Sequence, residues 1–161
     1  MRRLLILGIA LSLLALQPLF AAETPADAPA DNMEIVRDAI HAEKKLFIAE
    51  NMGLTEAEAE KFWPIYEEFQ NKWKAIVDRN LALIDKYAEA YTAMTDPVAD
   101  KLVRDYLAIE KDAVVLRESY LPKFSAVLPA AKVARYYQLE NKIQAVIHYD
   151  MAVEIPVIPV E

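Results

Sequence analysis

The sequence contains no cysteine among its 161 residues, which excludes a thiolate nucleophile and any disulfide. Glycine is nearly as scarce, because Gly53 is the only one beyond the first 22 residues, and a phosphate-cradling loop is therefore missing. Ser119 and Ser125 are the only serines in the same part of the chain, and neither lies in a nucleophile-elbow pattern. We therefore expect that the protein is not an enzyme and has no catalytic residues.

Positive charge is in deficit as well. The 18 Lys and Arg residues are outnumbered by 25 Asp and Glu residues, which gives a formal net charge of −7. A nucleic-acid-binding protein needs a basic face to neutralise phosphates. We therefore expect no nucleic-acid partner.

The one long apolar run lies at the start of the chain. Arg2 and Arg3 precede the apolar stretch Leu4–Leu16, and small residues at Ala21 and Ala22 follow a break at Gln17–Pro18. This order predicts a secretory signal peptide over residues 1–22, with an uncleaved membrane anchor as the alternative. The apolar stretch is short for a membrane span. We therefore expect an exported protein that does not span the membrane after cleavage.

The rest of the chain predicts an all-α fold. Residues 23–32 are small, acidic and proline-containing, which is typical of a disordered leader. Residues 33–153 form one predicted domain of four helical segments, two of them long, with short connections that favour an antiparallel hairpin or bundle. Residues 154–161 contain Pro156 and Pro159, so we expect an extended apolar tail there.

Local signals mark the ends of these segments. The first segment carries an apolar stripe of Ile35, Ala39, Ala42, Leu46 and Ala49, and Gly53 follows it as a predicted left-handed cap. Thr55 and Glu58 have the spacing of a capping box. Pro64 lies inside the second pattern, where it should either kink the helix or leave a separate short segment. Asp96 is the predicted cap of the third segment.

Aromatic residues are the positive signal for function. Phe62, Tyr66, Phe69 and Trp73 form a stripe at helical spacing, and most such residues belong to a core. Trp63 lies off that stripe, and the adjacent pair Tyr136 and Tyr137 should not both face one core line. Surplus aromatic side chains are candidates for an interface. The predicted partner-binding residues are Trp63, Tyr66, Phe69, Tyr136 and Tyr137.

Two cofactor arrangements are alternatives. Asp38 and His41 have the spacing of a metal-ligand pair, but a di-iron bundle needs that motif twice. Met33 or Met52 together with His148 resembles the haem ligands of exported four-helix cytochromes. Because surface histidines and core methionines explain these residues more simply, we expect no metal and no cofactor.

Two short motifs give the chain a family resemblance. Leu54–Glu58 resembles the Leu-Thr-x-x-Gln motif of the Spy/CpxP group of exported helical proteins, with Glu58 in place of Gln, and Leu128–Lys132 resembles a degenerate second copy. The resemblance implies a periplasmic, ATP-independent chaperone or envelope-stress protein that forms a curved homodimer and holds unfolded or envelope proteins. The acidic balance departs from the basic client-binding surface of that group. A haem- or metal-carrying bundle and a purely structural envelope protein are the alternatives.

Overall fold

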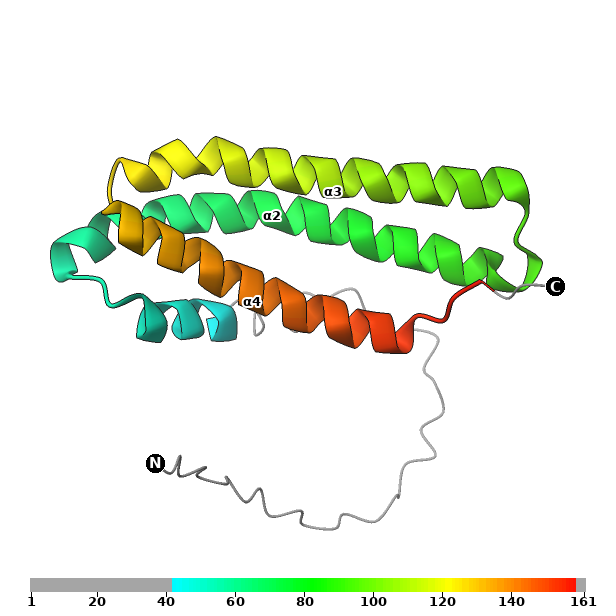
Figure 1. The fold of residues 1–161 in the computed structure, drawn as a ribbon, viewed down its shortest axis with the longest axis horizontal. Helices are drawn as coiled ribbons and strands as arrows, with labels where there is room; N and C mark the ends of the chain where they lie inside the picture. Colours follow the sequence, from blue (N-terminus) through cyan, green and yellow to red (C-terminus); the bar gives the residue numbers. More distant parts are fainter. Residues whose placement is uncertain (1–41, 159–161) are drawn as a thin grey trace, which may run out of the picture. The chain divides into compact units, whose positions relative to one another are not determined.

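The computed structural model describes residues 42–158, which belong to one compact unit. These residues form helices and no strand (Figure 1). The fold is therefore all-α, as the sequence predicts. The predicted signal peptide (1–22), the predicted leader (23–32) and the beginning of the first predicted helix (33–41) lie outside the described residues, as do residues 159–161. No helix in the described range is both long and apolar enough to cross a membrane.

The first described helix covers residues 42–52 and is followed by Gly53. Gly53 has a φ of +57°, in the left-handed region that a glycine enters without the clash of a Cβ atom. The predicted C-terminal cap is therefore confirmed.

The apolar stripe predicted on this first helix is wrong in its described part, residues 42–52. Leu46 and Ala49 are exposed, whereas Ile48 and Met52 are fully buried. Lys44 explains the difference, because its ammonium group is buried in an ion pair. Because Lys44 interrupts the apolar pattern on the buried face, apolar periodicity does not identify that face.

Helix α2 spans Glu56–Ala90 and begins with the predicted capping box. The amide of Glu58 donates to the Thr55 hydroxyl at 3.3 Å, and the amide of Thr55 donates to the Glu58 carboxylate at 2.8 Å. Pro64 lies inside α2, so the predicted separate short segment is wrong and one continuous helix forms. The first turns of α2 lie at an angle to the rest of the helix (Figure 1), as expected where proline removes an N–H group from the helical ladder.

A short 3-10 turn, η1 (Tyr91–Ala93), leads into α3, which spans Asp96–Ser125. The predicted cap at Asp96 is wrong by one residue. Thr95 has the extended backbone of the cap, and no side chain bonds to the helix start. Pro97 has no N–H, so the first turn has one donor fewer to be satisfied.

Helix α4 spans Ala130–Glu154 and starts directly after Pro129. Ile155 leaves the helix with an extended backbone (φ −91°, ψ 111°). We call the extended residues Ile155–Ile158 the tail segment.

Helices α2 and α3 lie side by side and run in opposite directions, and α4 runs in the same direction as α2 (Figure 1). The core is concentrated where the helix of residues 42–52 joins the other three. We call this region, which comprises residues 42–73, 113–125 and 130–140, the aromatic end. We call residues 80–110 and 143–158 the groove end. The aromatic end holds the fully buried side chains Ile48, Met52, Phe62, Tyr66, Tyr120, Phe124 and Tyr136.

Candidate functional site

Three of the five predicted partner-binding residues lie in the core. Tyr66, Phe69 and Tyr136 are at most 3% exposed. Their rings pack against each other, with 6.2 Å between the ring centres of Tyr66 and Tyr136 and 6.5 Å between those of Phe69 and Tyr136. These three side chains therefore have no surface to offer a partner in this conformation, and we do not carry them into the proposed site.

Tyr136 and Tyr137 both contact the aromatic core, contrary to the expectation that they could not share it. Tyr136 lies 4.6 Å from Phe124, and half-buried Tyr137 lies 6.3 Å from the same ring. The Tyr137 hydroxyl donates to the backbone carbonyl of Arg117 in α3 at 2.7 Å. Because α4 contacts both α2 and α3 at this point, its buried face is wider than a single stripe and accommodates adjacent residues.

Trp63 is half-buried and packs against the helix of residues 42–52. The ammonium of Lys45 lies 5.4 Å from the centre of the Trp63 ring, and Phe62 meets the same ring edge-on at 5.0 Å. The position of Trp63 off the main stripe turns its ring toward the helix of residues 42–52. Only its remaining exposed surface is open to a partner.

A polar network also lies within the aromatic end. Lys44 pairs with Glu140 at 2.8 Å, and both side chains are nearly buried. Gln70 accepts a hydrogen bond from Lys44 at 2.9 Å and donates one to Glu140 at 3.0 Å. Each charge therefore has an opposite charge and a hydrogen-bonding partner, as a buried ion pair requires. The network ties the first described helix to α2 and α4.

The residues of the cofactor alternatives are not brought together within the part of the chain that the structure describes. Met52 is buried in the aromatic core, whereas His148 is exposed at the groove end. Met33, Asp38 and His41 lie outside the described residues. Within 42–158 no group of three His, Cys, Asp or Glu side chains could hold a metal ion. The absence of a metal and of a cofactor stays a prediction.

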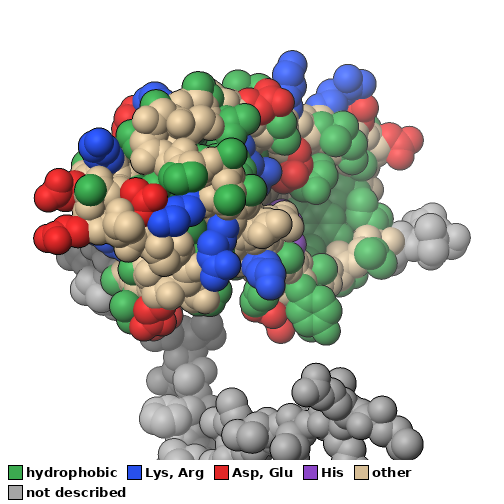
Figure 2. All heavy atoms as spheres, turned by 60° about the vertical axis from the view of Figure 1, so that its left-hand side comes forward, with side chains coloured by type: hydrophobic (Ala, Val, Ile, Leu, Met, Phe, Trp, Pro, Cys, Tyr) green, Lys and Arg blue, Asp and Glu red, His purple; other side chains and the backbone are tan. Residues whose placement is uncertain are grey.

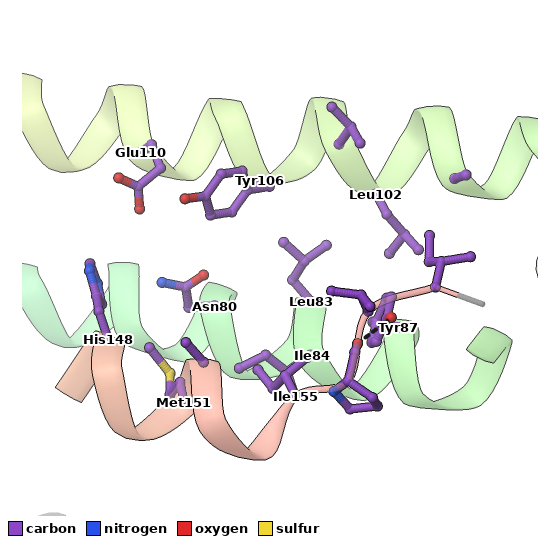
Figure 3. Close-up of a pocket in the computed structure, with 16 residues that line it drawn as sticks. Asn80, Leu83, Ile84, Tyr87, Leu102, Tyr106, Glu110, His148, Met151 and Ile155 are labelled. Carbon is purple, nitrogen blue, oxygen red and sulfur yellow. Dashed lines mark hydrogen bonds between the residues drawn. The ribbon is translucent and has the colours of Figure 1, made fainter. Parts of the chain in front are cut away.

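The groove end carries a concave surface that the sequence reading did not identify. A groove of about 680 Å³ lies between α2, α3, α4 and the tail segment (Figure 3). Apolar side chains from all four parts line it: Leu83, Ile84, Leu102, Val103, Met151 and Ile155. In Figure 2 hydrophobic side chains line a hollow with a histidine at its edge. This volume lies in the range of ordinary ligand sites.

Polar groups gather at one end of this groove. Asn80 of α2, Tyr106 and Glu110 of α3, and His148 of α4 line it there, away from the tail segment (Figure 3). Glu110 is the one carboxylate among the lining residues that the structure describes. The groove can therefore take an apolar occupant and orient it by a donor or positive group at this end.

Exposed apolar side chains continue the surface beyond the groove. Val103 and Leu107 on α3 are more than half exposed. Val146, Tyr149 and Val153 on α4 are also more than half exposed, but the helical repeat places them on the side of α4 turned away from its groove-lining residues. Exposed apolar patches next to a concave site are typical of interaction surfaces. The second half of α4 carries apolar residues on all sides of the helix, which is the sequence signal that could have indicated this surface.

Comparison with known proteins gives no match: no protein-family model, no curated protein and no solved structure is similar to this chain. The resemblance to the Spy/CpxP group therefore rests on the two short motifs alone and stays a prediction. The Leu54–Glu58 motif does have the predicted local structure, since it contains the capping box that starts α2.

Proposed function

We propose that the protein binds apolar segments of other polypeptides in the groove between α2, α3 and α4, without ATP. The observation that carries this proposal is the open apolar groove at one end of a helical unit whose other end is closed and densely packed. Burial of apolar surface drives most protein association.

Two further features support a polypeptide as the occupant, and a third supports binding without ATP. The exposed apolar side chains beside the groove extend the contact surface beyond the size of a small molecule. The chain's own tail segment, which is extended polypeptide, already lies along the groove. The sequence lacks the glycine-rich loop that nucleotide binding requires, so we infer holding by affinity alone.

The cellular setting of this proposal comes from the sequence. The signal-like segment of residues 1–22 and the resemblance to the Spy/CpxP group favour the periplasm as the compartment and a homodimer as the assembly. Both remain proposals. Mass spectrometry of the native protein tests the first, with an expected N-terminus between residues 22 and 30.

Groove variants test the binding function directly. Leu102 is half-buried and lines the groove, whereas Val115 is an exposed residue of the same helix outside it. We expect the wild-type protein to suppress the aggregation of a chemically denatured test protein. Leu102→Gln should reduce this activity at least severalfold, because it places an amide in the apolar contact surface.

The matched control is Val115→Gln, which adds the same amide to the same helix and should leave the activity unchanged. Circular dichroism checks that both variants keep their helices. Equal suppression by both variants would remove the groove from the proposed function, and no suppression by the wild type would contradict the function itself.

A further inference from the structure

Two tyrosine hydroxyls donate hydrogen bonds to backbone carbonyls of the tail segment and hold it against the groove. The Tyr87 hydroxyl donates to the carbonyl of Pro156 at 2.6 Å, and the Tyr91 hydroxyl donates to the carbonyl of Val157 at 3.4 Å (Figure 3 shows the first). Desolvation and the neighbouring Tyr91 raise the pKa of Tyr87 above its ordinary value. Both acceptors are backbone carbonyls, which any extended peptide presents. These contacts therefore recognise a backbone conformation rather than one side chain.

The tail segment has the composition of a preorganised extended peptide. The sequence repeats Ile-Pro-Val at positions 155–157 and 158–160. Proline fixes φ and lacks an N–H group, so such segments favour extended structure and bind with little loss of conformational entropy. Grooves lined with aromatic residues bind proline-containing segments for this reason. Tyr87 and Tyr106 provide aromatic rings in this groove.

The tail segment is held only loosely. Val157 is 86% exposed, Ile158 is nearly half exposed, and Ile155 is half-buried. The groove also retains its volume of about 680 Å³ beside these residues. A second segment of the same chemistry can therefore replace the tail segment or extend along the groove from it.

We propose that the groove is a binding site for extended, apolar, proline-containing segments of a partner polypeptide, with the chain's own tail segment as its resident occupant. This inference rests on the proposed function and narrows its ligand class. The tail segment then competes with the partner from within the same molecule. A tethered competitor acts at a local concentration in the millimolar range, so it sets the affinity threshold for partners.

The test uses the full chain and a fluorescent hexapeptide, Ile-Pro-Val-Ile-Pro-Val, in an anisotropy titration. The comparison peptide has both prolines replaced by alanine. We expect the proline peptide to bind about tenfold more tightly. Equal affinity for the two peptides, or no binding of either, overturns the inference.

Two variants should change this affinity in opposite directions. In the Ile155→Ser/Ile158→Ser variant the tail segment loses its apolar contacts and competes less for the groove. The proline peptide should therefore bind this variant about tenfold more tightly than it binds the wild-type protein. Leu102→Gln changes the groove itself and should weaken binding about tenfold. If Leu102→Gln unfolds, Val103→Gln replaces it, since Val103 is exposed and lines the same groove.

The matched control is Val146→Ser, which removes an exposed apolar side chain of α4 outside the groove lining and should change nothing. An unchanged affinity in the Ile155→Ser/Ile158→Ser variant overturns the role of the tail segment.

The two proposals fail separately. Suppression of aggregation without a preference for the proline peptide overturns only this inference, whereas peptide binding without suppression overturns the holding of unfolded proteins and leaves the groove as a site for extended segments.

Discussion

The two ends of the helical unit follow the same sequence pattern but reach different degrees of burial. The apolar stripe of α2 is buried at Phe62 and Trp73 in the aromatic end and only half-buried at Leu83 in the groove end. The stripe of α3 likewise changes from buried Phe124 to Tyr106, which is about half exposed. Helical periodicity is therefore a guide to the direction of a side chain but not to the extent of its burial.

The difference has two physical causes. At the aromatic end the helix of residues 42–52 adds a fourth helix to α2, α3 and α4, with Ile48 and Met52 fully buried among the aromatic rings. At the groove end, the extended tail segment takes that position among the described residues, and smaller side chains line the space. One end is therefore suited to stability and the other to binding.

Truncation of one apolar side chain at each end should give the largest contrast. Phe124 is fully buried, so Phe124→Ala should cost about 3–5 kcal/mol in the free energy of unfolding. Leu83 lines the open groove, and Leu83→Ala should cost about 1 kcal/mol. Urea unfolding measures both. Similar losses would mean that the groove end is as tightly packed as the aromatic end.

Trp63→Ala should have an intermediate effect. The sequence indicated a candidate interface residue, and Trp63 is half-buried against Phe62 and Lys45. We expect a loss of about 2 kcal/mol, between the values for core and surface residues. Thermal unfolding measures it, with Trp73→Ala as the buried reference. A loss below about 0.5 kcal/mol would restore Trp63 as an exposed anchor.

The sequence predicted the helices well because local interactions determine their ends. Gly53 and the Thr55–Glu58 box are set by backbone geometry within a few residues, and both have the predicted form. The candidate site was harder to predict, because the burial of a side chain depends on which helices pack together. The sequence does not indicate that Lys44 is buried, since its partner Glu140 is distant in sequence. The groove likewise arises from three helices and the tail segment, none of which forms it alone.

Loss of the cap of α2 should be smaller in effect than loss of a core ring. Thr55→Ala removes the hydroxyl that accepts from the amide of Glu58, and we expect a loss of about 0.5–2 kcal/mol. Because Glu58 also pairs with Lys132 of α4, the variant should loosen the aromatic end and leave the groove intact. Urea unfolding and peptide binding together check this. Weaker peptide binding in the variant would show that the two ends are coupled.

The smallest effect should be a change with pH at a surface ion pair of the aromatic end. Glu68 accepts hydrogen bonds from Lys123 of α3 at 3.0 and 3.1 Å and from Lys72 at 3.2 Å. The bond from Lys123, followed by those from Tyr120 and Lys72, lowers the pKa of Glu68 from 4.5 to about 2. The lowered pKa means that the folded state favours the ionised carboxylate. Its stabilising contribution is therefore present above pH 4.5 and is lost as the pH falls from about 4.5 to about 2.

An NMR titration of the Glu68 carboxyl carbon measures this pKa directly. Lys123→Gln should raise the pKa of Glu68 toward its ordinary value, because the variant removes the largest cause of the shift. Lys101→Gln is the control, since Lys101 pairs with Asp105 at 2.7 Å on the exposed side of α3 and should leave Glu68 unchanged. Since exposed ion pairs contribute little to stability, the shift in pKa should be clear while the unfolding midpoint at pH 7 hardly moves. A wild-type Glu68 that titrates near 4.5 would show that α2 and α3 are not joined by this contact in solution.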